Sequence, residues 1–147
     1  FRIWNLDEEK SAKEFNKKVF DKINEVFSSN ISIDEVYKEK PKNIRIARKI
    51  FFNFDEYFSW PSLENEIVSK TGFCYGLDSH FGILVNGDVI PCCLDQNACV
   101  KLGNTNSTQI EDILNSKRVL DIQKGFKNNI LVEELCQKCE YRTRFDK

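Results

Sequence analysis

The sequence predicts a mixed α+β protein of the α/β class, built from two parts. Three observations predict it: a strand pattern followed by an amphipathic helix at the N-terminus, an Asn-Gly pair between two apolar runs, and six cysteines that all lie beyond residue 73. Residue usage changes near residue 70, after which Cys, Asn-Gly and Gly-Asp become frequent. We therefore expect one domain over residues 1–70 and a second over residues 71–147.

The first part reads as strand, helix and strand. Residues 1–6 have the pattern of a buried strand, and residues 31–43 form a loop or a short helix. Residues 44–54 are rich in β-branched and aromatic side chains, which favours a strand. The aromatic residues of 54–61 predict a packing element that joins the two parts. An amphipathic helix is expected over residues 7–30, with one apolar face made of Ala12, Phe15, Val19, Ile23 and Val26.

The second part begins with a hairpin and continues with a helix. Asn86-Gly87 lies between two apolar runs and predicts a type I′ turn, in which both residues take a positive φ. Thr108 and Glu111 have the spacing of a capping box that opens a helix. We expect a kink at residues 115–116 and a C-terminal stop at Gly125.

The composition is that of a soluble globular protein. Of 147 residues, 41% are hydrophobic and 31% are charged, and 22 Lys and Arg against 23 Asp and Glu give a net charge of -1. Binding to nucleic acid is carried by a basic excess, so we expect no nucleic-acid partner. No apolar run approaches the roughly 18 residues that span a bilayer, and no signal peptide is visible, so we expect no membrane association and a cytoplasmic location.

The start of the chain is unusual. It begins with Phe1 and contains no Met. Because translation begins with Met, and because Phe1 already lies in a strand pattern, we expect the chain to be a C-terminal piece of a longer protein.

The clustering of the cysteines needs a local cause. Disulfides, zinc and an iron–sulfur cluster each explain an even number of cysteines. Disulfides require an oxidising compartment, which the expected cytoplasmic location does not provide. Metal binding is therefore favoured, and the six candidate residues are Cys74, Cys92, Cys93, Cys99, Cys136 and Cys139.

Two pairs of cysteines are spaced to share one centre. Cys136-x2-Cys139 allows two thiolates to bind one metal or cluster, and the hairpin folds Cys74 back toward Cys92. Neighbouring strand residues point to opposite faces, so one of Cys92 and Cys93 faces the metal while the other packs in the core. Four thiolates satisfy either tetrahedral zinc or a [4Fe–4S] cluster, and spacing alone leaves both open.

The cysteines belong to a longer pattern. Cys74-x12-Gly87-x4-Cys92 overlaps the stretch GDVIPCCLD at residues 87–95. This stretch is followed by Leu102-Gly103-Asn104, by the helix start at Thr108 and by Cys136-x2-Cys139. Together these motifs resemble the SPASM/twitch extension of radical S-adenosylmethionine (SAM) enzymes over about residues 71–145.

The resemblance implies a ligand set. It assigns one auxiliary [4Fe–4S] cluster to Cys74, Cys92, Cys136 and Cys139, with Cys99 in reserve. Full SPASM domains continue after the Cys-x2-Cys pair with five intervening residues and then another Cys, and at that position this chain has Phe145. A second auxiliary cluster is therefore not expected from these residues, and the shorter twitch arrangement is the better match.

The resemblance also gives the first part a role. Phe1 to Phe27 resembles the last strand and helix of a partial TIM-like barrel, and residues 44–60 resemble the bridge into the extension. The Cys-x3-Cys-x2-Cys motif that holds the SAM cluster is absent from the sequence. SAM and a second [4Fe–4S] cluster are then expected upstream, and this chain alone is expected to be inactive.

Two functions follow. In the first, the chain is part of a radical SAM enzyme that acts on a peptide or a small molecule, and the auxiliary cluster relays an electron or positions the substrate. In the alternative, the same four thiolates bind zinc and stabilise a non-catalytic binding module. Three cations lie near the ligands in sequence and are candidates to offset the negative charge of a cluster: Lys101, Arg142 and Arg144. Such residues more often face solvent. We also expect His80, the only histidine, to lie at the surface.

Overall fold

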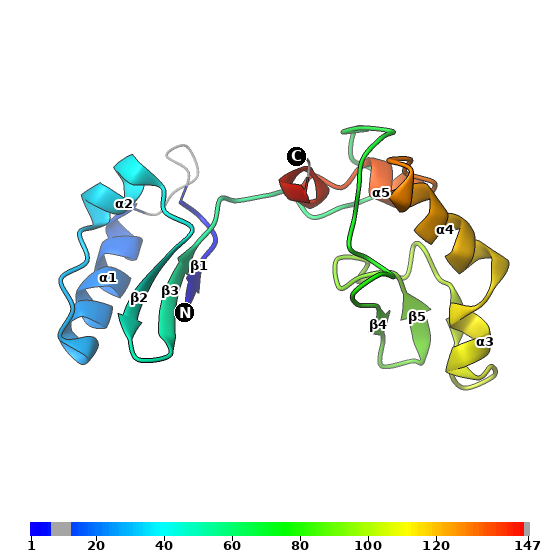
Figure 1. The fold of residues 1–147 in the computed structure, drawn as a ribbon, viewed down its shortest axis with the longest axis horizontal. Coiled ribbons are helices and arrows are strands. Elements are labelled where there is room, and N and C mark those ends of the chain that lie inside the picture. The colour runs from blue at the N-terminus through cyan, green and yellow to red at the C-terminus, as the bar shows by residue number, and fades with distance from the viewer. Residues whose placement is uncertain (7–12, 146–147) are drawn as a thin grey trace. The chain divides into compact units, whose positions relative to one another are not determined.

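The chain forms two compact units, Phe1–Tyr57 and Phe58–Lys147 (Figure 1). The structure is a computed structural model, and it describes residues 1–6 and 13–145. The division lies before the composition change near residue 70, because residues after Tyr57 already bind the second unit. The N–H groups of Val68 and Ser69, for example, both donate to the carbonyl oxygen of Gln137, at 2.9 and 3.1 Å.

The first unit contains a three-stranded sheet in the order β1-β3-β2. Strand β1 (Arg2–Ile3) runs parallel to β3 (Ile50–Phe54), and β2 (Asn43–Ala47) runs antiparallel to β3. The strand expected within residues 1–6 is confirmed. The single strand expected over residues 44–54 is wrong, because the polar pair Arg48-Lys49 forms a turn and the two halves pair as a hairpin.

Helices α1 (Lys13–Phe27) and α2 (Ile33–Glu39) pack together against this sheet (Figure 1). Helix α1 confirms the helix expected over residues 7–30, except that residues 7–12, Ala12 included, lie outside the described part. Its buried face is only partly the expected one. Ile23 is buried and Val19 packs half-buried against the core, whereas Phe15 and Val26 are exposed. Asn16 and Phe20 are buried instead. Asn16 is tolerated there because its amide donates to the hydroxyl of Tyr37 at 3.0 Å.

The second unit contains a small antiparallel sheet in the order β4-β5-β6. Strands β4 (Gly82–Ile83) and β5 (Asp88–Ile90) form the expected hairpin, and β6 (Gly103–Asn104) pairs with β5. The turn differs from type I′, because Gly87 has a φ of 86° whereas Asn86 has no positive φ. The turn is closed by the Gly87 N–H, which donates to the Leu84 carbonyl oxygen at 2.8 Å.

The helix expected from residue 108 is two helices, α3 (Ile110–Leu114) and α4 (Lys117–Lys127). The break at residues 115–116 is complete because Ser116 caps α4, its Oγ accepting the Val119 N–H at 3.4 Å. The expected capping box is wrong, since Gln109 occupies the N-cap of α3 and makes no side-chain cap bond.

Gly125 does not end the helix, as the sequence suggested, but lies buried inside α4. A Cβ on Gly125 would stand 2.6 Å from Cγ2 of Val132 and 2.8 Å from the Ile130 carbonyl oxygen. Glycine is therefore required here by the close return of the chain after α4.

The core of the second unit includes residues of α5 (Glu134–Gln137), which is followed by the 3-10 helix η1 (Tyr141–Phe145). None of the described helices is long and apolar enough to cross a membrane. Cys74, Leu102 and Cys136 pack at the edge of this core, whose buried members are Leu77, Val100, Val119, Ile122, Phe126, Leu131 and Leu135.

Candidate metal centre

The four cysteines of the expected ligand set line one small pocket of about 30 Å3. They come from three separate stretches: Cys74 precedes β4, Cys92 follows β5, and Cys136 and Cys139 lie in and just after α5. All four are half-buried free thiols. The pocket is completed by Pro61, Pro91, Asp95, Leu135 and Arg142.

A single turn of backbone connects Cys136 to Cys139. Helix α5 is a single turn, and the Cys139 N–H donates to the Cys136 carbonyl oxygen at 3.4 Å as the turn ends. Residues three apart on a helical turn share a face, so both thiols point to the same side. Leu135 is buried in the core and fixes α5 in this orientation.

Cys74 and Cys92 lie on either side of Gly76, which has no side chain to separate them. A Cβ on Gly76 would stand 3.1 Å from the Pro91 carbonyl oxygen, 3.7 Å from Cys74 Sγ and 3.7 Å from Cys92 Cβ. The segments before β4 and after β5 therefore lie in contact. The hairpin brings the two thiols together, as the sequence led us to expect.

The two remaining cysteines, Cys93 and Cys99, are exposed and lie outside the pocket. Cys92 and Cys93 do face different surroundings, but the expectation that one of them packs in the core is wrong. Strand β5 ends at Ile90, and the chain then turns, with the Asp95 N–H donating to the Cys92 carbonyl oxygen at 3.2 Å. Strand alternation therefore does not extend to Cys93. His80 is exposed, as expected.

Burial disfavours the charged form of the four pocket thiols. It raises the pKa of Cys92 to about 11, raises that of Cys136 further, and also raises those of Cys74 and Cys139. Repulsion among the thiolates adds to the effect for each sulfur except Cys74. A cationic centre that binds these sulfurs must therefore displace their protons.

Backbone N–H groups partly offset the cost of charging these sulfurs. The Gly76 N–H donates to Cys74 Sγ at 3.4 Å, the Leu94 N–H bonds to the sulfur of Cys92, and the N–H groups of Tyr141 and Arg142 bond to that of Cys139. N–H donors around thiolates are one of the features that set the potential of a bound iron–sulfur cluster.

Asp95 is a pocket residue that sequence reasoning did not single out. Asp95 is buried, with 2% of the residue exposed, and its carboxylate accepts the N–H groups of Cys99 at 2.7 Å and Val100 at 2.8 Å. The only available signal was its position three residues after Cys92 in the Cys-rich motif. These two bonds hold the loop that follows Cys92 against the core.

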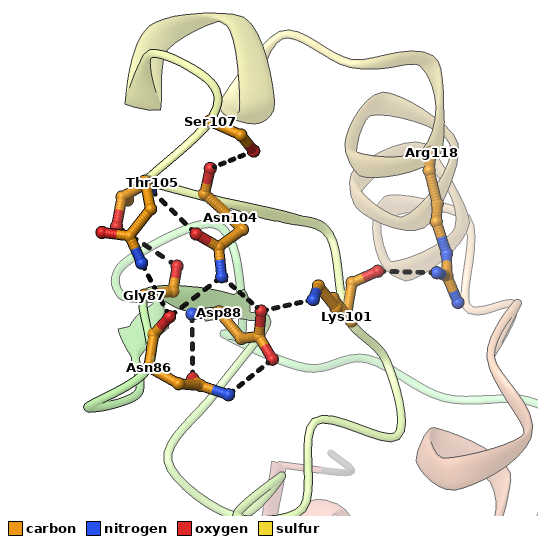
Figure 2. Close-up of polar contacts among 9 residues, drawn as sticks. Asn86, Gly87, Asp88, Lys101, Asn104, Thr105, Ser107 and Arg118 are labelled. Carbon is orange, nitrogen blue, oxygen red and sulfur yellow. Dashed lines mark hydrogen bonds and ion pairs between the residues drawn. The ribbon is translucent and has the colours of Figure 1, made fainter.

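Lys101 is held away from the pocket by a polar network around the hairpin turn (Figure 2). Its ammonium lies 2.5 Å from Asp88 Oδ1, which also accepts from Asn104 at 2.7 Å, while Asn86 donates to Asp88 Oδ2 at 2.9 Å. The hydrogen bonds from Lys101 and Asn104 lower the pKa of Asp88. Asp88 and Asn104, both in the sequence motif, thus stabilise the hairpin and do not line the pocket.

Comparison with known proteins identifies the second half of the chain. The family model of the SPASM iron–sulfur cluster-binding domain matches residues 74–140. This segment is a SPASM-type domain. The match begins at Cys74 and includes Cys92, Cys136 and Cys139, so the resemblance drawn from the sequence is confirmed. Comparison with curated proteins and with solved structures finds no match.

A SPASM-type domain binds an iron–sulfur cluster, and the donors in this pocket suit one. The pocket gathers four thiols, and thiolate is the ligand that iron–sulfur clusters use. In the described residues no group of three or more His, Cys, Asp or Glu side chains is arranged to hold a single metal ion. The assignment of individual ligands stays a prediction.

Proposed function

We propose that this chain is part of a radical SAM enzyme and that its SPASM-type domain holds one auxiliary [4Fe–4S] cluster. The ligands are Cys74, Cys92, Cys136 and Cys139. One observation carries the proposal: four thiols from three separate stretches line a single pocket within the segment that matches the SPASM family. SAM and its own cluster are bound by residues upstream of Phe1, and the substrate is a peptide or a small molecule.

The ligand count favours electron transfer or substrate positioning. When bound, a cluster of this kind supplies a site that accepts and releases one electron. Four protein thiolates occupy every iron of such a cluster, which leaves none open for a substrate. The protein would therefore fix the position of the cluster and donate backbone N–H groups to three of the four cysteine sulfurs.

Anaerobic reconstitution with iron and sulfide tests the cluster. We expect broad absorption in the visible range, about four irons per chain, and bleaching on reduction. Stoichiometric zinc bound in preference to iron, with no visible absorption, would instead support the zinc-stabilised binding module. Reconstitution and metal analysis on the same preparation separate these two functions.

A matched pair of neighbouring residues tests the ligand set. Cys92 lines the pocket whereas Cys93 is exposed outside it, so Cys92→Ala should deplete bound iron and Cys93→Ala should leave it unchanged. Both variants remove one thiol from the same turn, so the second controls for local structural effects. Equal loss of iron in the two variants would contradict the proposed ligand set.

A further inference from the structure

Arg142 is a buried cation within the cysteine pocket. Arg142 is only 2% exposed, and it lines the pocket together with the four thiols. Among the described residues that line this pocket, Arg142 carries the only positive charge. The guanidinium group of arginine is always positively charged in proteins.

The side chain of Arg142 packs closely against Gly72. A Cβ on Gly72 would stand 1.9 Å from Nη1, 2.6 Å from Cζ and 3.2 Å from Nε of Arg142. The guanidinium therefore lies directly against the Cα of Gly72, which itself has a φ of 142° that L-residues rarely adopt. No side chain other than hydrogen leaves room for Arg142 in this position.

The other two cations considered from the sequence lie elsewhere. Lys101 pairs with Asp88 in the hairpin network. Arg144 stacks its guanidinium over the rings of Phe58 and Tyr141, 5.0 and 4.8 Å from their centroids. Neither lines the cysteine pocket, so the structure separates three candidates that sequence proximity could not.

We propose that Arg142 sets the reduction potential of the cluster by holding a permanent positive charge beside the thiolates of Cys74 and Cys139. This inference rests on the proposed function. Reduction adds one electron to a centre that four thiolates already make anionic. A buried cation stabilises the reduced form more than the oxidised form, and low local dielectric strengthens the effect.

The position of Arg142 supports this role from geometry. Its guanidinium lies against Gly72, two residues before Cys74, and Arg142 follows Cys139 by three residues. Its backbone N–H bonds to the sulfur of Cys139. The opposing negative charge in the pocket, on Asp95, is bound by two backbone N–H groups.

A redox titration of the reconstituted chain tests the proposal. Arg142→Gln should lower the midpoint potential, so that the ratio of reduced to oxidised cluster at a fixed potential falls at least tenfold, which is about 59 mV for one electron. Arg142→Lys keeps the charge and should restore most of the wild-type potential. Arg144→Gln removes the same charge outside the pocket and should shift the ratio clearly less.

The Gly72→Ala variant tests the same charge by a second route, and Arg142→Lys is the variant that keeps both the charge and a long side chain in the pocket. Gly72→Ala keeps the arginine but displaces its guanidinium, and it should lower the potential in the same direction as Arg142→Gln.

Three outcomes concern the inference itself. A ratio of reduced to oxidised cluster that is unchanged within threefold, in every variant of Arg142 and Gly72 that holds a cluster, would overturn the inference. An equal shift in Arg144→Gln would also overturn it. Loss of the cluster from all of these variants while Arg144→Gln retains it would overturn it too, because Arg142 would then be needed for cluster retention. A wild-type chain that takes up no cluster would overturn the proposed function instead, so the two failures are distinguishable.

Discussion

The contact between Gly72 and Arg142 makes a strong prediction about stability. In Gly72→Ala, the new methyl group would stand 1.9 Å from Arg142 Nη1, so the guanidinium must leave its buried position. The backbone strain at a φ of 142° costs about 1–3 kcal/mol. Displacing a packed side chain adds about 1–3 kcal/mol, as for other overpacked sites. We therefore expect the free energy of unfolding to fall by about 2–6 kcal/mol.

A double-mutant cycle separates the two contributions. With Arg142→Ala already in place, Gly72→Ala should cost only the backbone strain, so the two substitutions should be non-additive by about 1–3 kcal/mol. Urea unfolding followed by fluorescence measures each free energy. The chain has two tryptophans, and Trp4→Phe leaves Trp60 as a reporter of the second unit.

Additivity would refute this reasoning. If Gly72→Ala lowers the free energy of unfolding equally with and without Arg142, to within about 0.5 kcal/mol, the guanidinium does not pack against Gly72. Gly82→Ala is a suitable control, because its Cβ would stand 2.9 Å from Cγ1 of Ile90 and 4.0 Å from the Cys92 carbonyl oxygen, with no atom of Arg142 among its nearest neighbours and no positive φ. Its cost should not depend on Arg142.

Three further predictions concern Asp95, the cysteine pair and Asp88. Asp95→Ala should destabilise the second unit by about 1–3 kcal/mol in urea unfolding, because it leaves the buried N–H of Val100 without an acceptor; a cost below about 0.5 kcal/mol would contradict this. In the metal-free chain at mildly alkaline pH, iodoacetamide should label Cys93 before Cys92, since burial raises the pKa of Cys92 to about 11; equal rates by mass spectrometry would argue against the pocket. The lowered pKa of Asp88 stabilises the fold above the unfolded-state value of about 3.9, and this contribution is lost as the pH falls through the lower folded-state pKa. The thermal midpoint of the wild type should therefore drop more steeply on acidification than that of Asp88→Asn, and parallel curves would exclude this role.

Much of the local structure could be predicted from the sequence. The helix after residue 12, the hairpin around Asn86-Gly87 and the match of the Cys-rich motif were all visible, because helix periodicity, turn residues and ligand spacing are properties of a few neighbouring residues. Errors arose where a local pattern had more than one solution. The run 44–54 became a hairpin once Arg48-Lys49 formed a turn, and the stretch from residue 108 split where Ser116 capped a new helix.

The site divides in the same way between sequence and fold. Spacing and resemblance predicted which four cysteines lie together, and the structure brings those four to one pocket. Only the tertiary structure decided that Cys93 is exposed, that Asp95 and Arg142 line the pocket, and that Lys101 is held by Asp88 instead. The physical reason is that these outcomes depend on contacts between segments far apart in the chain. Arg142 meets Gly72 across 70 residues, and no local pattern encodes that a glycine there leaves space for its guanidinium.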